Sequence, residues 1–145
     1  MNLTLVLVRG LPGSGKRTLA NMLSMRALAA DDYFMVNDEY EFDGAKLAAA
    51  HEWCQKETLA SLSKGDSVAV ANTFTMRWEM ERYIQIAAET GAALRVFSLF
   101  DSGCTDAELF ARCTLDVPIE AVARMRARWE RDWANENPLP PWERE

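Results

Sequence analysis

Cysteine and histidine are scarce in this chain of 145 residues, which contains three cysteines and one histidine. The cysteines, Cys54, Cys104 and Cys113, are odd in number and include no CxxC pair, so neither a disulfide framework nor a zinc site is expected. This composition suits a reducing, cytoplasmic compartment. The single histidine, His51, falls on one side of an expected helix, where a packing role is favoured over a role in an active site.

Long hydrophobic runs and a positive net charge are also missing. The apolar run at residues 3–8 is too short to cross a membrane, and no basic segment or small-residue cleavage site flanks it. The net charge of -6 argues against broad, charge-driven adhesion to nucleic acid. Local contacts stay open, because arginine outnumbers lysine 12 to 4 and suits bidentate binding of phosphate. We therefore expect a soluble protein with no membrane partner.

The hydrophobic content of 49% is enough for one domain with a real core, and the chain is too short for two. We expect one domain over residues 1–136 and a proline-containing tail at 137–145. Strand patterns occur at 3–8, weakly at 27–30, and at 67–71 and 94–99, separated by helical patterns at 16–26, 44–63, 76–90, after Asp106, and from 119 to about 134. This alternation predicts an α/β fold with a small parallel sheet and helices on both faces.

A glycine-rich segment follows the first expected strand and opens the first expected helix. Its sequence, "GLPGSGKRTLA" at residues 10–20, matches a phosphate-binding loop except at Arg17, where the pattern has a serine or threonine that ligates magnesium. Backbone N–H groups of such a loop converge on an anion, and Lys16 can reach the β- and γ-phosphates. The order of strand, loop and helix predicts a P-loop NTPase fold that binds ATP or another nucleoside triphosphate. The expected nucleotide contacts are Gly13, Ser14, Gly15, Lys16, Arg17 and Thr18.

Arg17 raises the question of how Mg²⁺, the expected metal cofactor, is held. Thr18 still offers a hydroxyl one residue later, and Gly-Lys-Arg-Thr is similar to the Gly-Lys-Gly-Thr of adenylate-kinase-type loops. That resemblance implies that the threonine contacts the α-phosphate, while magnesium is held largely through water and acidic groups. Arg17 then adds charge or lies outward on the helix.

An acidic pair, Asp31-Asp32, lies at the end of the weak second strand. The carboxyl ends of neighbouring strands in a doubly wound sheet face one crevice, which places Asp31 or Asp32 opposite the γ-phosphate. A carboxylate there can accept the proton of an attacking hydroxyl or help to hold magnesium. The alternative is that the pair caps a turn.

Several spaced motifs resemble those of the polynucleotide-kinase-like P-loop kinases over nearly the whole chain, up to about residue 130. They are "GLPGSGK", "ADDYF", "AHEWC", "NTFTMRWEMERY" and the late "ELFARC" followed by "VP", in the same order. The resemblance implies a short helical lid in which Arg112 contacts the phosphates. It also implies that Asp31 is the general base and a candidate metal ligand, and that Asn72 and Thr73 face the phosphates or the acceptor.

The acidic pair departs from polynucleotide 5′-kinases, which flank it with arginines where this chain has Ala30 and Phe34. A methyl group and a ring suit a flat, mostly uncharged acceptor better than a DNA end. This pattern is similar to that of bacteriophage enzymes that phosphorylate 5-hydroxymethyluracil within DNA, which implies DNA with a modified base as the partner and the host cytoplasm as the location. The aromatic residues available for stacking on a base are Tyr33, Phe34, Phe74 and Trp78, unless they fill the core.

The last expected helix carries two rows of side chains. Val122, Met125, Trp129 and Trp133 recur at helical spacing, which predicts an apolar stripe that packs on the domain. The arginine row is Arg124, Arg128 and Arg131, which is either a contact for nucleic-acid phosphates or ordinary surface charge.

The sequence leaves other functions open. A polynucleotide 5′-hydroxyl kinase and a small nucleoside or nucleotide kinase both share the motifs. A nucleotide-dependent switch or adaptor is also compatible, because Arg17 and the apolar Ala71 just before Asn72 weaken the expected magnesium site. A general base at Asp31 favours the kinase, because a passive nucleotide binder has no need of one.

Overall fold

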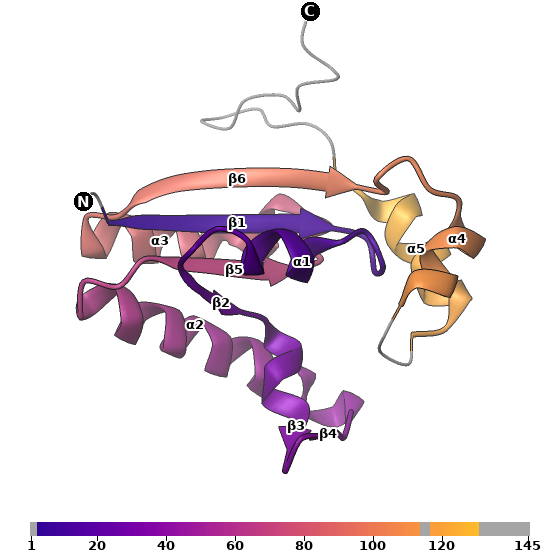
Figure 1. Ribbon diagram of the computed structural model, residues 1–145, viewed down its shortest axis with the longest axis horizontal. Coiled ribbons are helices and arrows are strands. Elements are labelled where there is room, and N and C mark those ends of the chain that lie inside the picture. The colour runs from indigo at the N-terminus through magenta and orange to yellow at the C-terminus, as the bar shows by residue number, and fades with distance from the viewer. Residues whose placement is uncertain (1–2, 114–116, 131–145) are drawn as a thin grey trace, which may run out of the picture.

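The centre of the molecule is a parallel sheet with helices on both faces (Figure 1). The computed structural model describes residues 3–113 and 117–130. Within these residues the main sheet has four parallel strands in the order β2-β5-β1-β6. The strands are β1 (Thr4–Gly10), β2 (Arg26–Leu28), β5 (Val68–Asn72) and β6 (Ala93–Phe100). This topology confirms the expected α/β P-loop fold; the expected tail at 137–145 lies outside the described residues.

The helices fall close to the segments that periodicity indicated. They are α1 (Lys16–Asn21), α2 (Leu47–Ser63), α3 (Glu81–Thr90), α4 (Asp106–Arg112) and α5 (Ile119–Arg128), with short 3-10 helices η1 (Ala30–Phe34), η2 (Gly44–Lys46) and η3 (Arg77–Met80). In the part of the chain that the structure describes, none of them combines the length and the apolar composition that crossing a bilayer requires.

Alternation along β1 explains why helices cover both faces of the sheet. Leu5 and Leu7 point into a core shared with α2 and α3, whereas Val6 and Val8 point into a second core shared with α1. All four side chains are buried, so β1 reads as a continuous apolar run in the sequence. The sheet therefore places the carboxyl end of β1, and the loop that follows it, between two layers of helices.

The first helix is shorter than its periodicity suggested. The helical pattern was expected to reach residue 26, but α1 ends at Asn21 and Arg26 already belongs to β2. Ser24 adopts a left-handed φ of 56° in the intervening turn. Leu19 and Leu23 still pack on the same core, which is why the apolar spacing continued beyond the helix.

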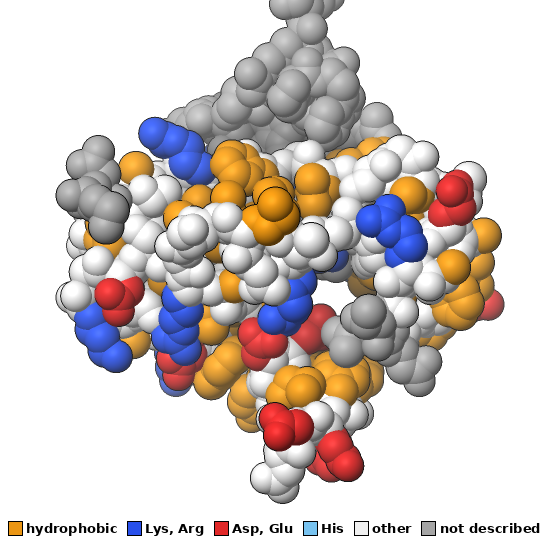
Figure 2. All heavy atoms as spheres, viewed as in Figure 1, with side chains coloured by type: hydrophobic (Ala, Val, Ile, Leu, Met, Phe, Trp, Pro, Cys, Tyr) orange, Lys and Arg blue, Asp and Glu red, His pale blue; other side chains and the backbone are white. Residues whose placement is uncertain are grey.

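A small hairpin, β3 (Met35–Val36) and β4 (Glu39–Tyr40), was not expected from the sequence. Its two-residue turn places Asn37 and Asp38 at φ values of 52° and 65°, which asparagine and aspartate tolerate better than most residues. Figure 2 shows acidic and hydrophobic side chains together at the projecting end of the molecule, where Figure 1 has this hairpin. Exposed acids follow one another closely in this segment, at Asp38, Glu39, Glu41 and Asp43.

Helices α4 and α5 lie together beyond the carboxyl ends of β1 and β6 (Figure 1). A third core joins them to the glycine-rich segment through Leu11, Leu109, Val122 and Trp129. Val122 and Trp129 therefore pack as expected, while Trp133 and Arg131 lie outside the described residues. The helix expected to reach about residue 134 ends at Arg128, since Trp129 has a non-helical ψ of 120°.

Candidate active site

The glycine-rich segment joins β1 to α1 and packs against the lid helix α4. Gly13 and Gly15 have φ values of 81° and 99°, a conformation that favours glycine. A Cβ atom at Gly13 would also collide with the backbone carbonyl of Leu109, so the close approach of α4 excludes any side chain there. The Ser102 hydroxyl donates a hydrogen bond to the Ser14 carbonyl (2.6 Å), which holds the loop from the β6 side. Glycine at position 13 thus allows both the backbone conformation of the loop and the close packing of α4 against it.

Lys16 lies inside this loop. Its Nζ atom donates a hydrogen bond to the Leu11 carbonyl at 3.0 Å. Burial lowers the pKa of Lys16 to about 8, and the negative charge of Asp31 partly opposes this shift. The ammonium group is therefore enclosed and lies within the electrostatic reach of Asp31.

The lowered pKa of Lys16 predicts a pH dependence of ATP binding. A bound triphosphate favours the charged ammonium and raises this pKa, so binding takes up a proton when the pH is above about 8. Affinity should fall roughly tenfold between pH 7 and pH 9, as measured by calorimetry in buffers of different ionisation enthalpy. The control is Lys16→Arg, whose guanidinium stays charged in this range and gives a flat profile. A flat profile for the unmodified protein would refute the prediction.

Arg17 and Thr18 differ in where they point. Arg17 Nη2 forms an ion pair with Asp32 Oδ1 at 2.7 Å, across the surface between α1 and η1. This contact agrees with the outward orientation that was one of the two expectations for Arg17. Thr18 is exposed at the next position of α1.

The two acidic residues of η1 have separate surroundings. Asp32 accepts a hydrogen bond from the Ala29 backbone N–H (3.0 Å) in addition to its ion pair with Arg17. Asp31 instead accepts a long hydrogen bond from the Tyr40 hydroxyl (3.4 Å) and acts electrostatically on Lys16. Burial and the charge of Asp31 together raise the pKa of Tyr40 to about 12. Asp32 is thus the turn-capping residue, and Asp31 is the one whose charge acts on Lys16.

The end of β5 fixes the position of η1. The Asn72 Oδ1 atom accepts a hydrogen bond from the Ala30 backbone N–H at 2.9 Å, in a buried environment. The Thr73 carbonyl accepts a hydrogen bond from the Gly10 N–H at 3.2 Å. These two residues therefore join the acidic segment and the first residue of the glycine-rich segment to one strand end.

The four aromatic candidates divide into two pairs. Phe34 and Phe74 are 3% and 2% exposed and belong to the main core, so these rings are core residues and offer no surface for stacking. Phe34 packs edge-on against Tyr33, Tyr40 and Phe42. Tyr33 and Trp78 are 37% and 65% exposed and keep ring surface open to solvent.

Arg112 stands at the end of α4, beside the glycine-rich segment. A Cβ atom built on Gly15 would lie 3.8 Å from Arg112 Nη2, and Arg112 Nη1 donates a hydrogen bond to Cys104 Sγ at 3.0 Å. The lid arginine implied by the family resemblance thus lies where it can contact a phosphate in the loop. Cys54, by contrast, is fully buried, and burial raises its pKa, as expected for a packing residue rather than a nucleophile.

Two buried or half-buried arginines were missed by the sequence reasoning. Arg126 of α5 forms ion pairs with Asp101 and Asp106, both at 2.7 Å, and so fastens the lid to the end of β6. Arg9 at the end of β1 is fully buried and donates hydrogen bonds to the Phe74, Thr75 and Glu130 carbonyls. The one feature of the sequence that could have indicated the role of Arg9 is its position, as a charged residue directly after an uninterrupted apolar run. That position gave no indication of which groups Arg9 would bind.

Magnesium would find few protein ligands here. Residues 3–113 and 117–130 contain no group of three or more His, Cys, Asp or Glu side chains placed to hold a metal ion. Mg²⁺ in nucleotide sites commonly uses one or two carboxylates together with phosphate oxygens and waters. Asp31 fits that limited role, whereas Asp32 is already engaged by Arg17 and the η1 backbone.

Comparisons with known proteins agree with this geometry. A family model described as an AAA domain matches residues 5–131. Human NEDD4-binding protein 2 is 42% identical over 93 residues, which are 60% of this chain and 5% of that protein. A chain in the Pnkp1/Rnl/Hen1 RNA repair complex is similar with a TM-score of 0.66 at 17% identity, covering 88% of this chain and 44% of that one. The APS kinase CysC of Mycobacterium tuberculosis, solved with AMPPNP and APS, is similar with a TM-score of 0.53 at 17% identity, covering 85% and 68%.

These likenesses establish the fold. The chain spans about one twentieth of the human relative and less than half of the RNA repair chain, so the activities of those whole proteins do not transfer to it directly.

Proposed function

The chain belongs to the AAA domain family and has a P-loop kinase-like fold, and from this premise we propose that it transfers the γ-phosphate of ATP to a hydroxyl group on nucleic acid. The observation that carries the proposal is the juxtaposition of three groups. Lys16 sits inside the phosphate-binding loop, Asp31 acts on it electrostatically from η1, and Arg112 lies over Gly15. A nucleotide switch needs the first of these groups but has no use for Asp31.

Each of these three residues has a role in the proposed reaction. Lys16 and Arg112 stabilise negative charge on the phosphates, which is the main source of catalysis in phosphoryl transfer. Asp31 orients the acceptor hydroxyl and takes its proton, while the acceptor oxygen forms a bond to the γ-phosphorus. The bond between that phosphorus and the β,γ-bridging oxygen breaks, and ADP leaves. Magnesium, which Asp31 would help to hold, would supply further positive charge to the phosphates.

For the acceptor, we infer the 5-hydroxymethyl group of 5-hydroxymethyluracil in DNA. Support comes from the two positions that flank the acidic segment, since Ala30 and Phe34 stand where polynucleotide 5′-kinases carry arginines, and both are buried. A 5′-terminal acceptor brings its own backbone phosphates close to the base, and neither of these two positions offers them a cation. A base-linked hydroxymethyl group places no phosphate at that point.

A polynucleotide 5′-hydroxyl kinase is the second candidate. The structural likeness to a chain of an RNA repair complex favours it, as does the order of the sequence motifs. A small nucleoside or nucleotide kinase shares the same loop and general base, and differs only in the size of the acceptor.

One labelling experiment tests these acceptors together. The protein would be incubated with Mg²⁺ and ATP labelled at the γ-phosphate, with three acceptors in parallel: a 5′-phosphorylated oligonucleotide containing 5-hydroxymethyluracil, a plain oligonucleotide with a 5′-hydroxyl, and free nucleosides. We expect label on the first acceptor and on its modified base. Label on the 5′ ends alone would reject the modified base, and no label on any acceptor would favour the nucleotide-dependent switch.

A further inference from the structure

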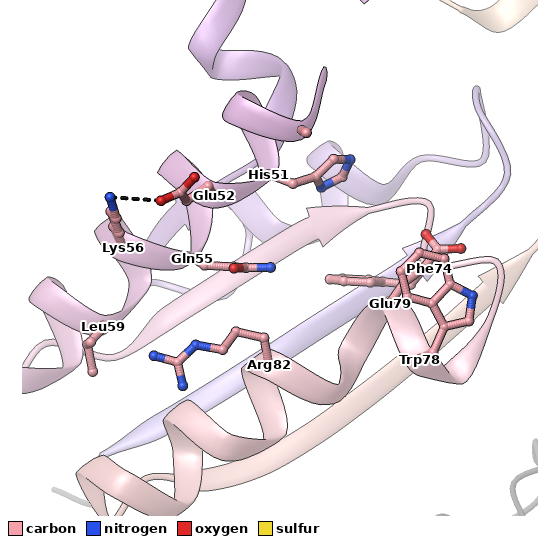
Figure 3. Close-up of a pocket in the computed structure, with 10 residues that line it drawn as sticks. His51, Glu52, Gln55, Lys56, Leu59, Phe74, Trp78, Glu79 and Arg82 are labelled. Atoms are coloured by element: carbon pink, nitrogen blue, oxygen red, sulfur yellow. Dashed lines mark ion pairs between the residues drawn. The ribbon is translucent and has the colours of Figure 1, made fainter. Parts of the chain in front are cut away.

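A groove of about 670 Å³ lies between α2 on one side and η3 with α3 on the other (Figure 3). We call it the α2–α3 groove. His51 and Gln55 come from α2, Trp78 from η3 and Arg82 from α3, and Phe74 lies at the carboxyl end of β5. The volume falls within the range of pockets that bind small organic groups.

The groove begins next to the candidate active site. Phe74 follows directly after Asn72 and Thr73, the strand end that holds η1 and the glycine-rich segment. Helix α2, which forms one wall of the groove, also packs against η1, which carries Asp31; the Tyr33 ring lies 6.1 Å from the ring of Trp53, on a face of α2 outside the groove lining. The groove and η1 are therefore attached to the same strand end and to the same helix.

The walls of the groove present groups that suit a nucleobase. Trp78 is 65% exposed, so a broad aromatic face is available for stacking. The Gln55 amide points into the space between the two helices in Figure 3, and an amide offers both donors and an acceptor to the edge of a base. Arg82 supplies a cation; its ion pair with Glu89 is exposed and 3.2 Å long, so a phosphate can replace it at small cost.

The distribution of charge on the surface also favours the groove as the path of a nucleic-acid strand. Phosphates are repelled by the acidic hairpin segment, where Asp38, Glu39, Glu41 and Asp43 are exposed. Along the groove the charges balance. Lys56 and Glu52 pair at 3.0 Å, Arg82 is positive, and Glu79, which accepts a hydrogen bond from the Thr75 hydroxyl, is negative, so the groove repels phosphates less than the hairpin segment does. The charged and amide side chains on both walls also make the groove a poor fit for an apolar helix of a protein partner.

We propose that the α2–α3 groove binds an unpaired nucleobase of the acceptor strand together with its neighbouring phosphate. Trp78 stacks on the base, Gln55 hydrogen-bonds to its edge, and Arg82 contacts the phosphate. This inference rests on the proposed function, because it takes the acceptor to be nucleic acid. The groove would hold the nucleotide next to the one that is phosphorylated. It would therefore fix the direction in which the strand crosses the active site.

The test measures binding of a fluorescein-labelled, unmodified single-stranded oligonucleotide by anisotropy at low salt. Trp78→Ala should weaken binding about five- to 100-fold, as expected for loss of one stacked base, and Trp78→Tyr should restore most of it. Gln55→Leu provides a second variant and should weaken binding less. The matched control is Phe97→Ala: Phe97 is also exposed (39%) but lies opposite Val8, on the other face of the sheet. Equal affinities for Trp78→Ala and Phe97→Ala would overturn the proposal.

The same variants separate this inference from the proposed function. If the protein phosphorylates nucleic acid and Trp78→Ala changes neither oligonucleotide affinity nor KM, the groove is not the strand site and the function stands. If binding depends on Trp78 and no hydroxyl is phosphorylated, the groove stands and the kinase assignment falls. Specific capture of a peptide by the groove, without any oligonucleotide binding, would reject the nucleobase.

Discussion

Replacing Asp31 with asparagine should reduce phosphoryl transfer by roughly 10²- to 10⁴-fold, the usual contribution of a positioned general base. Asparagine keeps the shape of the side chain and can still accept the hydrogen bond from Tyr40, but it cannot take a proton from the acceptor hydroxyl. Lys16 and Arg112 are unchanged, so ATP affinity should stay within about fivefold. Single-turnover transfer and equilibrium binding of ATP give the two quantities separately.

Asp32→Asn is the matched control, because the two acids are neighbours on the same short helix. Asp32 holds Ala29 and Arg17 and has no direct effect on Lys16 large enough to shift its pKa. Its loss removes one exposed ion pair, which should change the transfer rate by less than about fivefold. Full transfer by Asp31→Asn, or equal losses in the two variants, would show that Asp31 is not the base.

The contrast between these two acids also shows which features of the site could not be predicted from the sequence. The phosphate-binding loop and the four parallel strands could be predicted because each depends on a local pattern: glycine spacing, or a buried apolar run. The separate roles of Asp31 and Asp32 depend on partners distant in sequence, at Lys16 and Arg17. Spacing alone placed both acids at the crevice and could not separate the capping residue from the one whose charge acts on Lys16.

Residues that change role with burial were equally hard to predict. Phe34 and Trp78 are both aromatic and both lie close to a motif, yet one is 3% and the other 65% exposed. The difference arises because the β3–β4 hairpin and its flanking rings enclose Phe34, and no strand pattern had indicated that hairpin. The α2–α3 groove was not visible in the sequence for the same reason, since its walls come from separate segments, 48–59 and 74–82, that only the fold brings together.

Arg9 gives the second large expected effect, and this one concerns stability. Its guanidinium is fully buried and donates to Phe74 O (2.8 Å), Thr75 O (3.1 Å) and Glu130 O (3.2 Å), while lying 3.9 Å over the Trp129 ring. Burial lowers the pKa of Arg9 to about 10, so the group stays charged at neutral pH. It therefore ties the end of β1 to the loop after β5 and to the segment that follows helix α5.

Arg9→Met should lower the free energy of unfolding by about 3–5 kcal/mol, because hydrogen bonds to a buried charged donor contribute roughly 1.5–3 kcal/mol each and the contact with the Trp129 ring is lost as well. Methionine fills much of the same volume, but it donates no hydrogen bond. The buried Phe74 carbonyl loses its guanidinium donor, while the Thr75 carbonyl keeps the hydrogen bond from the Glu130 N–H. The midpoint of thermal unfolding should fall by roughly 10–15 °C for a domain of this size. The matched control is Arg95→Met on β6, an exposed arginine whose hydrogen bond within the described part of the chain goes to the neighbouring Leu94 carbonyl, with an expected change within about 0.5 kcal/mol.

Arg9→Lys distinguishes the charge of Arg9 from its shape. Lysine keeps the positive charge, but its single nitrogen cannot bridge three carbonyls that a planar guanidinium meets from different sides. If the forked geometry is what matters, Arg9→Lys should be nearly as unstable as Arg9→Met, and thermal unfolding of the two variants side by side would show it. Because the same guanidinium joins the Phe74 and Thr75 carbonyls to Glu130, both variants should also lose phosphoryl transfer below their unfolding temperature. A stable Arg9→Met protein with full transfer would mean that the packing of Trp129 and the hydrogen bonds of Arg128 and Glu130 to Thr75 hold the end of α5 without Arg9.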